Sequence, residues 1–506
     1  MKVFLLYPDR DFDFDGVLPR NRADLVADLE IDTLLNAMAG GDAFVREVSG
    51  KVLLAGLDGP EPIGYRQRVL ADCIDRPDVV RAMYDLAGAA LRDKRGVWGF
   101  LSSQNPASVL SAAVGQLEVL LVRLRQLRRI AEADGGAFRS DAFTAFFRTV
   151  LTELGDDYLE EVTGHLKQLR FPGGQLISAD LSQDNSGINY VLRSGTARRG
   201  WKERVGIAPR TVYAFTLPPR DEAGMQSLDA ITGRGINAVA NAAAQAADHV
   251  SSFFTMLRAE LAFYVGCLNL HDRLSAREVP VCFPEPAGPD GVTFACADLR
   301  DASLALRVTP VVGNDADTAG RPLVVITGAN SGGKSTFLRS VGLAQLMTQC
   351  GMFVTARSFR SSLCRGIFTH FIREEDPDLV SGRLDSELAR MSDIADLIGR
   401  GDVILFNESF AATNEREGSE IGRQIVTALL EAGVRVFFVT HNFDLASGLG
   451  RQRPDAALFL RAPRQPNGRR EYKLAPAPPL PTSFGADIYD RIGGWQGEAG
   501  ARPRPA

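Results

Sequence analysis

Cysteine is scarce in this sequence, and the spacing of the few cysteines excludes some classes of protein. Only six cysteines occur in 506 residues, without a Cys-x-x-Cys pair or a histidine placed to complete a metal site. The pattern excludes a disulfide-stapled secreted fold and predicts reduced thiols in a cytoplasmic protein, with no metal held by cysteine. The six are Cys73, Cys267, Cys282, Cys296, Cys350 and Cys364.

Long apolar runs are also missing. No uninterrupted stretch reaches the roughly 18 residues of a membrane span, so we expect no membrane association. The chain starts with a basic residue and a short apolar run, but Pro8-Asp9-Arg10-Asp11 ends that run too early for a secretory signal.

Positive charge is not in excess. The sum of Lys and Arg is 57 against 62 for Asp and Glu, a net charge of −5, so nucleic-acid binding would need a local basic face. Only seven of these residues are lysines, a bias that a GC-rich genome explains most simply and that makes each lysine informative. The remaining composition, 45% hydrophobic and 24% charged, is that of a globular chain with two to four domains.

Hydrophobic spacing predicts helices through the first half of the chain. Leucines recur at helical intervals in 25–35 and 110–130, and an alanine-rich helical pattern covers 231–274. Strand-like spacing appears at 188–192 and 211–217, between turn-forming segments. We therefore predict a helical region over 1–135 and a second one over 136–280, which carries a small β insert near 171–220.

A Pro/Gly-rich segment at 280–290 marks the main predicted boundary. Beyond it, buried strands are expected at 323–326, 403–406, 434–439 and 457–460, with helices between them. This alternation predicts a parallel α/β sheet in a domain at 291–492, followed by a flexible tail at 493–506 that is rich in Gly, Pro and Arg.

The β insert holds basic residues around Trp201. Cations neutralise phosphates and displace counterions, so this mixture suits contact with a nucleic-acid backbone, while a loop without such a role fits the sequence equally well. The candidates for DNA contact are Arg198, Arg199, Lys202 and Arg204.

The strongest chemical signal is a glycine-rich loop between a predicted strand and a predicted helix. It reads Gly328-Ala329-Asn330-Ser331-Gly332-Gly333-Lys334-Ser335-Thr336. Glycines let backbone N–H groups wrap phosphates, the helix N-terminus adds its dipole, Lys334 reaches the β and γ phosphates, and the Ser335 hydroxyl faces Mg²⁺. We predict that this loop binds ATP with Mg²⁺; a glycine-rich turn without function is the weaker interpretation.

Two later strands end in polar residues that suit the same site. The apolar run after Asp402 leads to Asn407-Glu408, where a carboxylate can orient and deprotonate water. The next run leads to Thr440-His441, and a histidine at a strand tip can hydrogen-bond a γ-phosphate. The order and spacing favour function for Glu408 and His441 over a structural role.

Several segments together resemble the MutS family of DNA mismatch-repair ATPases. They are 328–336, 349–356, 366–369, 381–383, 440–445 and 482–485, in the family's order across 299–492, with a weaker likeness to its core and lever helices at 65–70. The resemblance implies a helical core and lever joined to an ABC-type P-loop ATPase that acts as a dimer on DNA, with possible repair-protein partners. It would be cytoplasmic, and nucleoid-associated when bound to DNA.

By this resemblance the residues take defined roles. The loop from Gly328 to Thr336 binds the phosphates and Mg²⁺, Glu408 handles the attacking water, and His441 senses the γ-phosphate. Each composite site would take a segment from the partner subunit, for which Ser381, Arg383 and Ser386 are the candidates.

Three departures from the family pattern stand out. Asn407, which with Ser335 is our candidate for the metal site, replaces the usual Asp before the catalytic acid. An amide brings no negative charge, so we hypothesise weaker Mg²⁺ retention or slow turnover. Leu384-Asp-Ser-Glu-Leu388 replaces the usual Ser/Thr-rich signature. The mismatch-reading domain is expected to be missing, because the only Phe-x-Glu matches are 283–285 and 406–408.

The sequence thus leaves two functions to separate. The first is a DNA-binding ATPase that acts on mismatched, branched or otherwise distorted duplexes. The alternative is a nucleotide-gated scaffold for protein partners without DNA affinity, which the acidic balance supports. A transporter ATPase is disfavoured by the long helical leader and the lack of a Leu-Ser-Gly-Gly-Gln signature, and a small-molecule kinase by the lack of a lid-like arginine cluster.

Overall fold

A computed structural model of the chain describes residues 1–98, 105–172, 174–193, 214–218, 220–289, 291–372, 382–411, 413–463 and 470–481. The chain divides into two compact units. The first contains residues 1–12 and 76–261, and the second contains residues 13–75 and 262–506. The architecture is that of a multidomain α/β protein in which helices predominate and the strands form several sheets.

This division differs from the predicted domain boundaries in two places. The helices of 13–75 group with the sheets of the second unit, and the break at 261/262 falls inside a helix instead of in the Pro/Gly-rich segment at 280–290. Hydrophobic spacing shows that a segment is helical, but it does not show which neighbour buries its apolar face.

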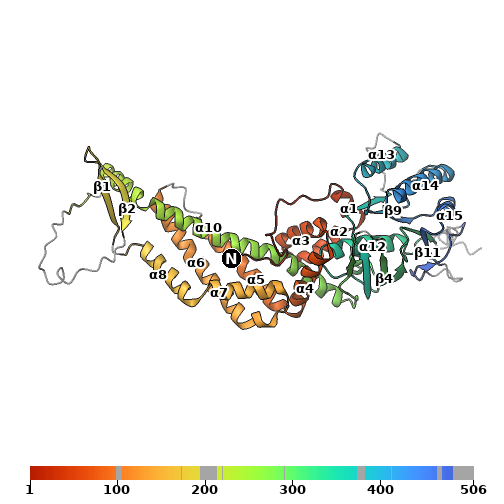
Figure 1. The fold of residues 1–506 in the computed structure, drawn as a ribbon, viewed down its shortest axis with the longest axis horizontal. Coiled ribbons are helices and arrows are strands. Elements are labelled where there is room, and N and C mark those ends of the chain that lie inside the picture. The colour runs from red at the N-terminus through yellow and green to blue at the C-terminus, as the bar shows by residue number, and fades with distance from the viewer. Residues whose placement is uncertain are drawn as a thin grey trace, which may run out of the picture. The chain divides into compact units, whose positions relative to one another are not determined.

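The first unit consists of long helices and one hairpin (Figure 1). Its elements are α5 (Pro77–Trp98), α6 (Pro106–Asp134), η1 (Gly135–Ala137), α7 (Asp141–Glu153), α8 (Asp156–Leu169), β1 (Leu176–Leu181), β2 (Gly187–Arg193) and the part of α10 (Glu222–Ser275) up to residue 261.

The hairpin confirms the β insert in part. Strand β2 was predicted, and it pairs in antiparallel fashion with β1, which the sequence pattern did not reveal. Both strands alternate weakly and are largely exposed, so β1 lacks the apolar signal of a buried strand. Residues 214–217 of the other predicted strand are not in a strand, and 211–213 lie outside the described residues.

The second unit carries the predicted parallel sheet. Its elements are α1 (Arg22–Asp28), α2 (Ile31–Ala39), α3 (Ala43–Ala55), α4 (Pro60–Asp75), β3 (Glu285–Ala287), β4 (Phe294–Leu299), α11 (Ala302–Ala305), β5 (Asn314–Asp317), β6 (Leu323–Gly328), α12 (Lys334–Gln349), β7 (Ser358–Ser362), β8 (Ile367–Phe371), α13 (Arg383–Ala395), β9 (Val403–Asn407), α14 (Glu415–Glu431), β10 (Arg435–Val439), α15 (Phe443–Gln452), β11 (Ala457–Ala462), β12 (Ala475–Pro476) and the end of α10 from residue 262.

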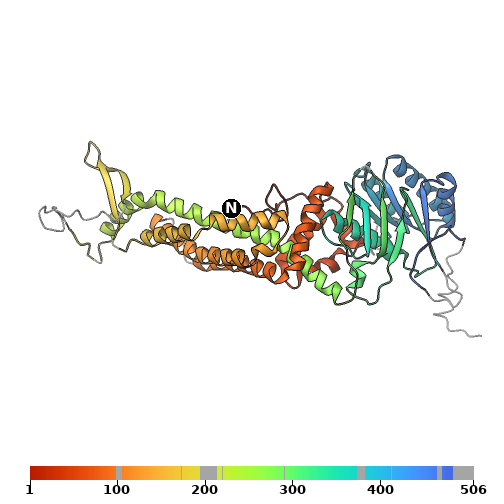
Figure 2. The same cartoon turned by 60° about the horizontal axis from the view of Figure 1, so that its bottom comes forward.

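Strands β8, β9, β10, β6 and β11 lie side by side and parallel, with β12 antiparallel at one edge. The four predicted strands of this sheet are therefore confirmed, and β8 is an addition. A second sheet, with the order β3-β7-β4-β5, lies in the same unit (Figure 2). Phe294 of β4 contacts Phe437 of β10, with ring centroids 5.1 Å apart.

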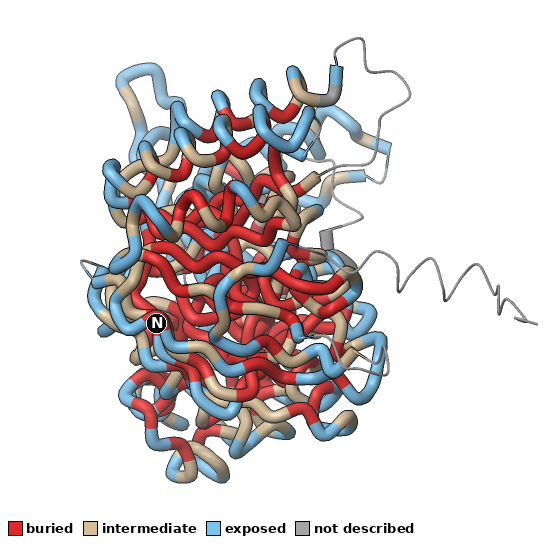
Figure 3. Tube along the Cα trace, turned by 90° about the vertical axis from the view of Figure 1, so that its right-hand side faces the viewer, coloured by how far each residue is buried: buried red, intermediate tan, exposed pale blue. Residues whose placement is uncertain are grey.

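Helices cover the parallel sheet on both faces. Helices α13, α14 and α15 pack on one face, and α12 packs against β6, β9 and β10 on the other while also touching β3 and β4 of the second sheet (Figure 1). Many residues of the central strands and of α12 are buried, whereas exposed residues lie on the outer turns of helices and on loops (Figure 3). With both faces covered, the carboxyl ends of the parallel strands are the natural place for a site.

Two described helices, α6 and α10, are long and apolar enough to span a membrane by length and composition alone. The sequence prediction concerned uninterrupted apolar runs, whereas the apolar stretches of these two helices include charged residues. Buried helices of globular proteins pass the same test, and 78% of the most apolar stretch of α10 is buried. The six cysteines are unpaired thiols.

A buried glutamate on α10 anchors the start of the chain within the first unit. The Glu260 side chain is fully buried, and its Oε2 accepts hydrogen bonds from the backbone N–H groups of Leu5 at 2.6 Å and Leu6 at 3.1 Å. Burial raises the pKa of Glu260 from its ordinary value of 4.5 to about 7. The segment before α1 is thus attached to α10 by a carboxyl group that titrates near neutrality.

This contact predicts a pH-dependent stability. A carboxyl group with a raised folded-state pKa stabilises the fold fully below its unfolded pKa, and the contribution is lost as the pH rises to about 7. Glu260→Gln keeps a neutral acceptor, so relative to the wild type it should gain on the order of 2 kcal/mol of unfolding free energy between pH 5 and pH 8. Urea unfolding at both pH values measures this. The control Glu161→Gln, at an exposed position on α8, should show no such gain, and equal pH profiles for wild type and Glu260→Gln would contradict the assignment.

Candidate nucleotide-binding site

The glycine-rich loop connects β6 to α12 at the carboxyl edge of the parallel sheet. Three of its residues have left-handed backbone angles, Gly328 (φ 111°), Ser331 (φ 55°) and Gly333 (φ 88°). A Cβ on Gly328 would stand 2.5 Å from the carbonyl oxygen of Ala462, so only glycine fits there. The loop ends at the first turn of α12, where backbone N–H groups have no helical partner and attract anions.

Lys334, at the start of α12, points back into this loop. Its Nζ donates to the carbonyl oxygens of Gly328 at 3.2 Å and Ala329 at 3.1 Å, and it lies 3.3 Å from Nε2 of His441. Burial lowers the pKa of Lys334 to about 8, while the negative charge of Glu408 acts in the opposite direction. The ammonium group is therefore still mostly protonated at neutral pH.

Glu408 and His441 meet above the same edge. The turn after β9 carries Glu408, the turn after β10 carries His441, and Oε1 of Glu408 lies 2.8 Å from Nε2 of His441. The hydrogen bond with His441 lowers the pKa of Glu408, so the carboxylate stays ionised. Glu408 remains 36% exposed, which leaves it within reach of water. Nδ1 of His441 is buried without a hydrogen-bond partner among the described residues.

The predicted metal pair is also assembled. The Ser335 hydroxyl donates to Oδ1 of Asn407 at 2.8 Å, so the two oxygens proposed to face Mg²⁺ are neighbours. Oxygen donors are the ligands that Mg²⁺ prefers, and it usually takes only one or two from the protein. The pair fits such an ion, with a neutral amide in place of a carboxylate.

Two residues that sequence reasoning missed lie against the loop. Arg470 donates from Nε to the carbonyl oxygen of Asn330 at 3.1 Å. Tyr472, which is 50% exposed, has its Cβ 3.5 Å from the place where a Cβ on Gly333 would stand. In the sequence, the only hint of these two residues is an aromatic side chain among basic ones after β11. That this segment folds back against the glycine-rich loop depends on tertiary packing.

Other predicted residues are not placed at this edge. The DNA-contact candidates Arg198, Arg199, Lys202 and Arg204 lie outside the described residues, as does Ser381. Arg383 begins α13, and the Ser386 hydroxyl in its first turn donates to the carbonyl oxygen of Gly382 at 3.4 Å. Their assignment to a partner's site remains a prediction.

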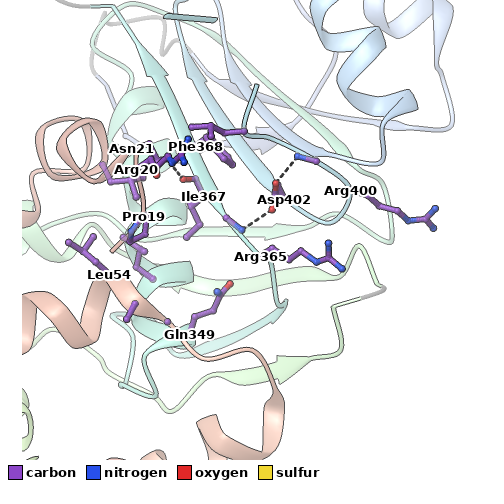
Figure 4. A pocket seen from close by; sticks show the side chains of 17 residues that line it. Pro19, Arg20, Asn21, Leu54, Gln349, Arg365, Ile367, Phe368, Arg400 and Asp402 are labelled. Carbon is purple, nitrogen blue, oxygen red and sulfur yellow. Dashed lines mark hydrogen bonds between the residues drawn. The ribbon is translucent and has the colours of Figure 1, made fainter. Parts of the chain in front are cut away.

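A cavity of about 410 Å³ lies at the opposite, amino-terminal edge of β8 and β9 (Figure 4). The carboxylate of Asp402, which lines this cavity, accepts hydrogen bonds from the backbone N–H groups of Gly366 at 2.8 Å and Gly399 at 2.7 Å. Arg365 and Arg400 extend away from the apolar lining. Asp402 therefore fixes two loops and stands apart from the chemistry at the other end of β9.

The fold defines the class as a multidomain α/β protein with a glycine-rich loop at the carboxyl edge of a parallel sheet. Two family models match the chain: the MutS2 N-terminal domain over residues 58–277 and MutS domain V over residues 324–464. The chain belongs to the MutS family.

Individual relatives are similar over parts of the chain. The DNA mismatch repair protein MutS of Thermus aquaticus is 31% identical over 191 residues, which cover 37% of this chain and 23% of that protein. The MutS protein homolog 4 of Mus musculus is 31% identical over 136 residues, which cover 27% of this chain and 14% of that protein. The chain thus spans less than a quarter of the length of these relatives.

The contact between Ser335 and Asn407 predicts what a negative charge at position 407 would do to Mg²⁺ binding. Asn407→Asp places a carboxylate at the predicted metal position and should lower the Mg²⁺ concentration for half-maximal nucleotide binding by about tenfold, because charged oxygens hold Mg²⁺ more strongly. Titration with a fluorescent ATP analogue measures this. The control Asn414→Asp, at the N-cap of α14, should leave the Mg²⁺ dependence unchanged. Unaltered Mg²⁺ dependence and turnover in Asn407→Asp would rule out the hypothesis.

Proposed function

We propose that the second unit binds ATP with Mg²⁺ and hydrolyses it. The observation that carries the proposal is the convergence of Lys334, Glu408 and His441, from three different elements, beside the glycine-rich loop. Lys334 and the N–H groups at the start of α12 would bind the phosphates, and Ser335 and Asn407 would hold the metal. The bound ion neutralises negative charge on the phosphates.

Glu408 is the group suited to accept a proton from water. It is ionised, partly exposed and held by His441, which limits the orientations of its carboxylate. His441 in turn lies between Glu408 and Lys334, where it can register a charge placed beside the ammonium group. Tyr472 offers an exposed aromatic ring for the base, and Arg470 adds positive charge.

Hydrolysis by the purified protein tests this proposal. Glu408→Gln keeps the size of the side chain but removes the proton acceptor, so kcat should fall about 100-fold or more while ATP still binds. Phosphate release measures turnover, and equilibrium titration with labelled ATP measures binding. A matched control is Glu415→Gln, at the start of α14, which should turn over as the wild type does. If Glu408→Gln keeps wild-type turnover, Glu408 does not have this role.

We further infer that ATP binding and hydrolysis change the affinity of the protein for DNA. Support comes from the match of residues 58–277 to the MutS2 N-terminal domain and from relatives that are named DNA mismatch repair proteins. The proposed partners are mismatched, branched or otherwise distorted duplexes and a second copy of this chain, which would supply Ser381, Arg383 or Ser386 to each composite site. We also propose a cytoplasmic location, because six unpaired cysteines suit a reducing compartment.

DNA binding separates this proposal from the scaffold alternative. Binding to homoduplex, single-mismatch, four-way-junction and single-stranded DNA should depend on ATP and Mg²⁺ and weaken with salt. Replacing Arg198, Arg199 and Lys202 by alanine should lower affinity uniformly and reduce the salt slope by about one for each phosphate that is no longer neutralised.

The matched control for this prediction removes three positive charges from the second unit, at Arg20, Arg365 and Arg400, and should leave DNA affinity unchanged. Absence of binding to all four DNA types, together with ATP hydrolysis, would overturn the DNA proposal and favour a nucleotide-gated scaffold for protein partners.

A further inference from the structure

The turn that follows β9 has a backbone that its own residues disfavour. Glu408 (φ 59°) and Phe410 (φ 64°) both adopt left-handed angles, although neither is glycine. Each such residue costs on the order of 1 kcal/mol or more, so the turn persists only when surrounding groups hold it. The first stabilising contact is the hydrogen bond from the Glu408 N–H to the carbonyl oxygen of Val439, at 2.9 Å.

Helix α13 supplies a second stabilising contact to this turn. The carboxylate of Glu387, which is only 6% exposed, accepts a hydrogen bond from the backbone N–H of Phe410 at 2.6 Å. This bond fixes the backbone two residues after Glu408, at one of the two left-handed positions.

His370 of β8 connects the same helix to the residue between them. Its Nε2 lies 3.0 Å from the carbonyl oxygen of Glu387, and its Nδ1 lies 2.7 Å from the hydroxyl of Ser409. Burial lowers the pKa of His370 to about 4, so the ring is neutral at physiological pH. Because a carbonyl oxygen only accepts, Nε2 carries the proton. The Ser409 hydroxyl also donates to the backbone carbonyl oxygen of His370 at 2.6 Å, so Ser409 contacts β8 at two points.

Ring packing completes the contact. The ring of Phe410 stacks on that of His370 with centroids 5.3 Å apart and planes 20° apart. Helix α13 is itself tied to β8, because Arg390 donates to the carbonyl oxygen of Phe371 at 2.8 Å. Both residues that follow Glu408 are therefore held by α13 and β8, at contacts separate from the nucleotide loop.

We propose that Glu387 is a positioning residue for hydrolysis: by holding the N–H of Phe410, it sets the turn that aims the Glu408 carboxylate at the reacting water. The inference rests on the proposed ATPase function. It makes the placement of α13 a determinant of the hydrolytic rate, while the groups that bind phosphate and base lie elsewhere. A displacement of α13 would change turnover with little effect on nucleotide affinity.

The test compares variants of Glu387 in the full chain. Glu387→Ala removes the acceptor, and Glu387→Asp withdraws it by one methylene group while keeping a carboxyl group, so both should lower kcat about tenfold or more. Their Kd for a labelled ATP analogue should stay within about twofold of wild type. Glu387→Gln keeps an oxygen that accepts from Phe410 and should restore kcat to within about threefold of wild type.

Asp393→Asn, on an exposed position of the same helix, is the matched control and should behave as the wild type. Wild-type kcat in a folded Glu387→Ala or Glu387→Asp variant would overturn the inference, as would equal losses in Glu387→Gln and Glu387→Ala. If Glu387→Ala fails to fold, the comparison of Glu387→Asp with Glu387→Gln decides. Absence of ATP hydrolysis by the wild type and the control would contradict the proposed function instead.

Discussion

The enclosure of helix α12 is the constraint on which the second unit depends. Thirteen of its sixteen residues are buried, and it packs against strands of both sheets. A helix enclosed in this way cannot slide or rotate without disturbing two cores at native packing density. The loop at its N-terminal end and Lys334 are thereby fixed relative to the ends of β9 and β10, where Glu408 and His441 stand.

The other end of α12 is held just as firmly. Arg66 of α4 is fully buried and donates to the carbonyl oxygen of Cys350, the C-cap of α12, at 2.9 Å. Its guanidinium group also lies 5.5 Å from the ring centroid of Phe263. A positive charge at a helix C-terminus interacts favourably with the helix dipole. The helices of residues 13–75 are therefore attached to the same element that carries the glycine-rich loop.

Much of the parallel sheet was predictable because its strands are buried on both faces. Such strands read as continuous apolar runs, and β6, β9, β10 and β11 each contain one. Strand β8 was missed, since a threonine and a histidine interrupt its short run, although all five residues are buried. The strands of the second sheet are short or polar, and their pairing partners are distant in sequence, so local patterns could not reveal them.

The candidate site divides in the same way. The sequence alone determined the loop, Lys334, Glu408 and His441, because phosphate chemistry requires particular residue types at particular spacings after apolar strands. Only the tertiary structure decided that Arg470 and Tyr472 return across the loop, that residues 13–75 pack with the sheets, and that Glu387 and His370 hold the turn after β9. The reason is physical: these contacts join segments far apart in the chain, and their distances depend on how α12, α13 and the two sheets pack.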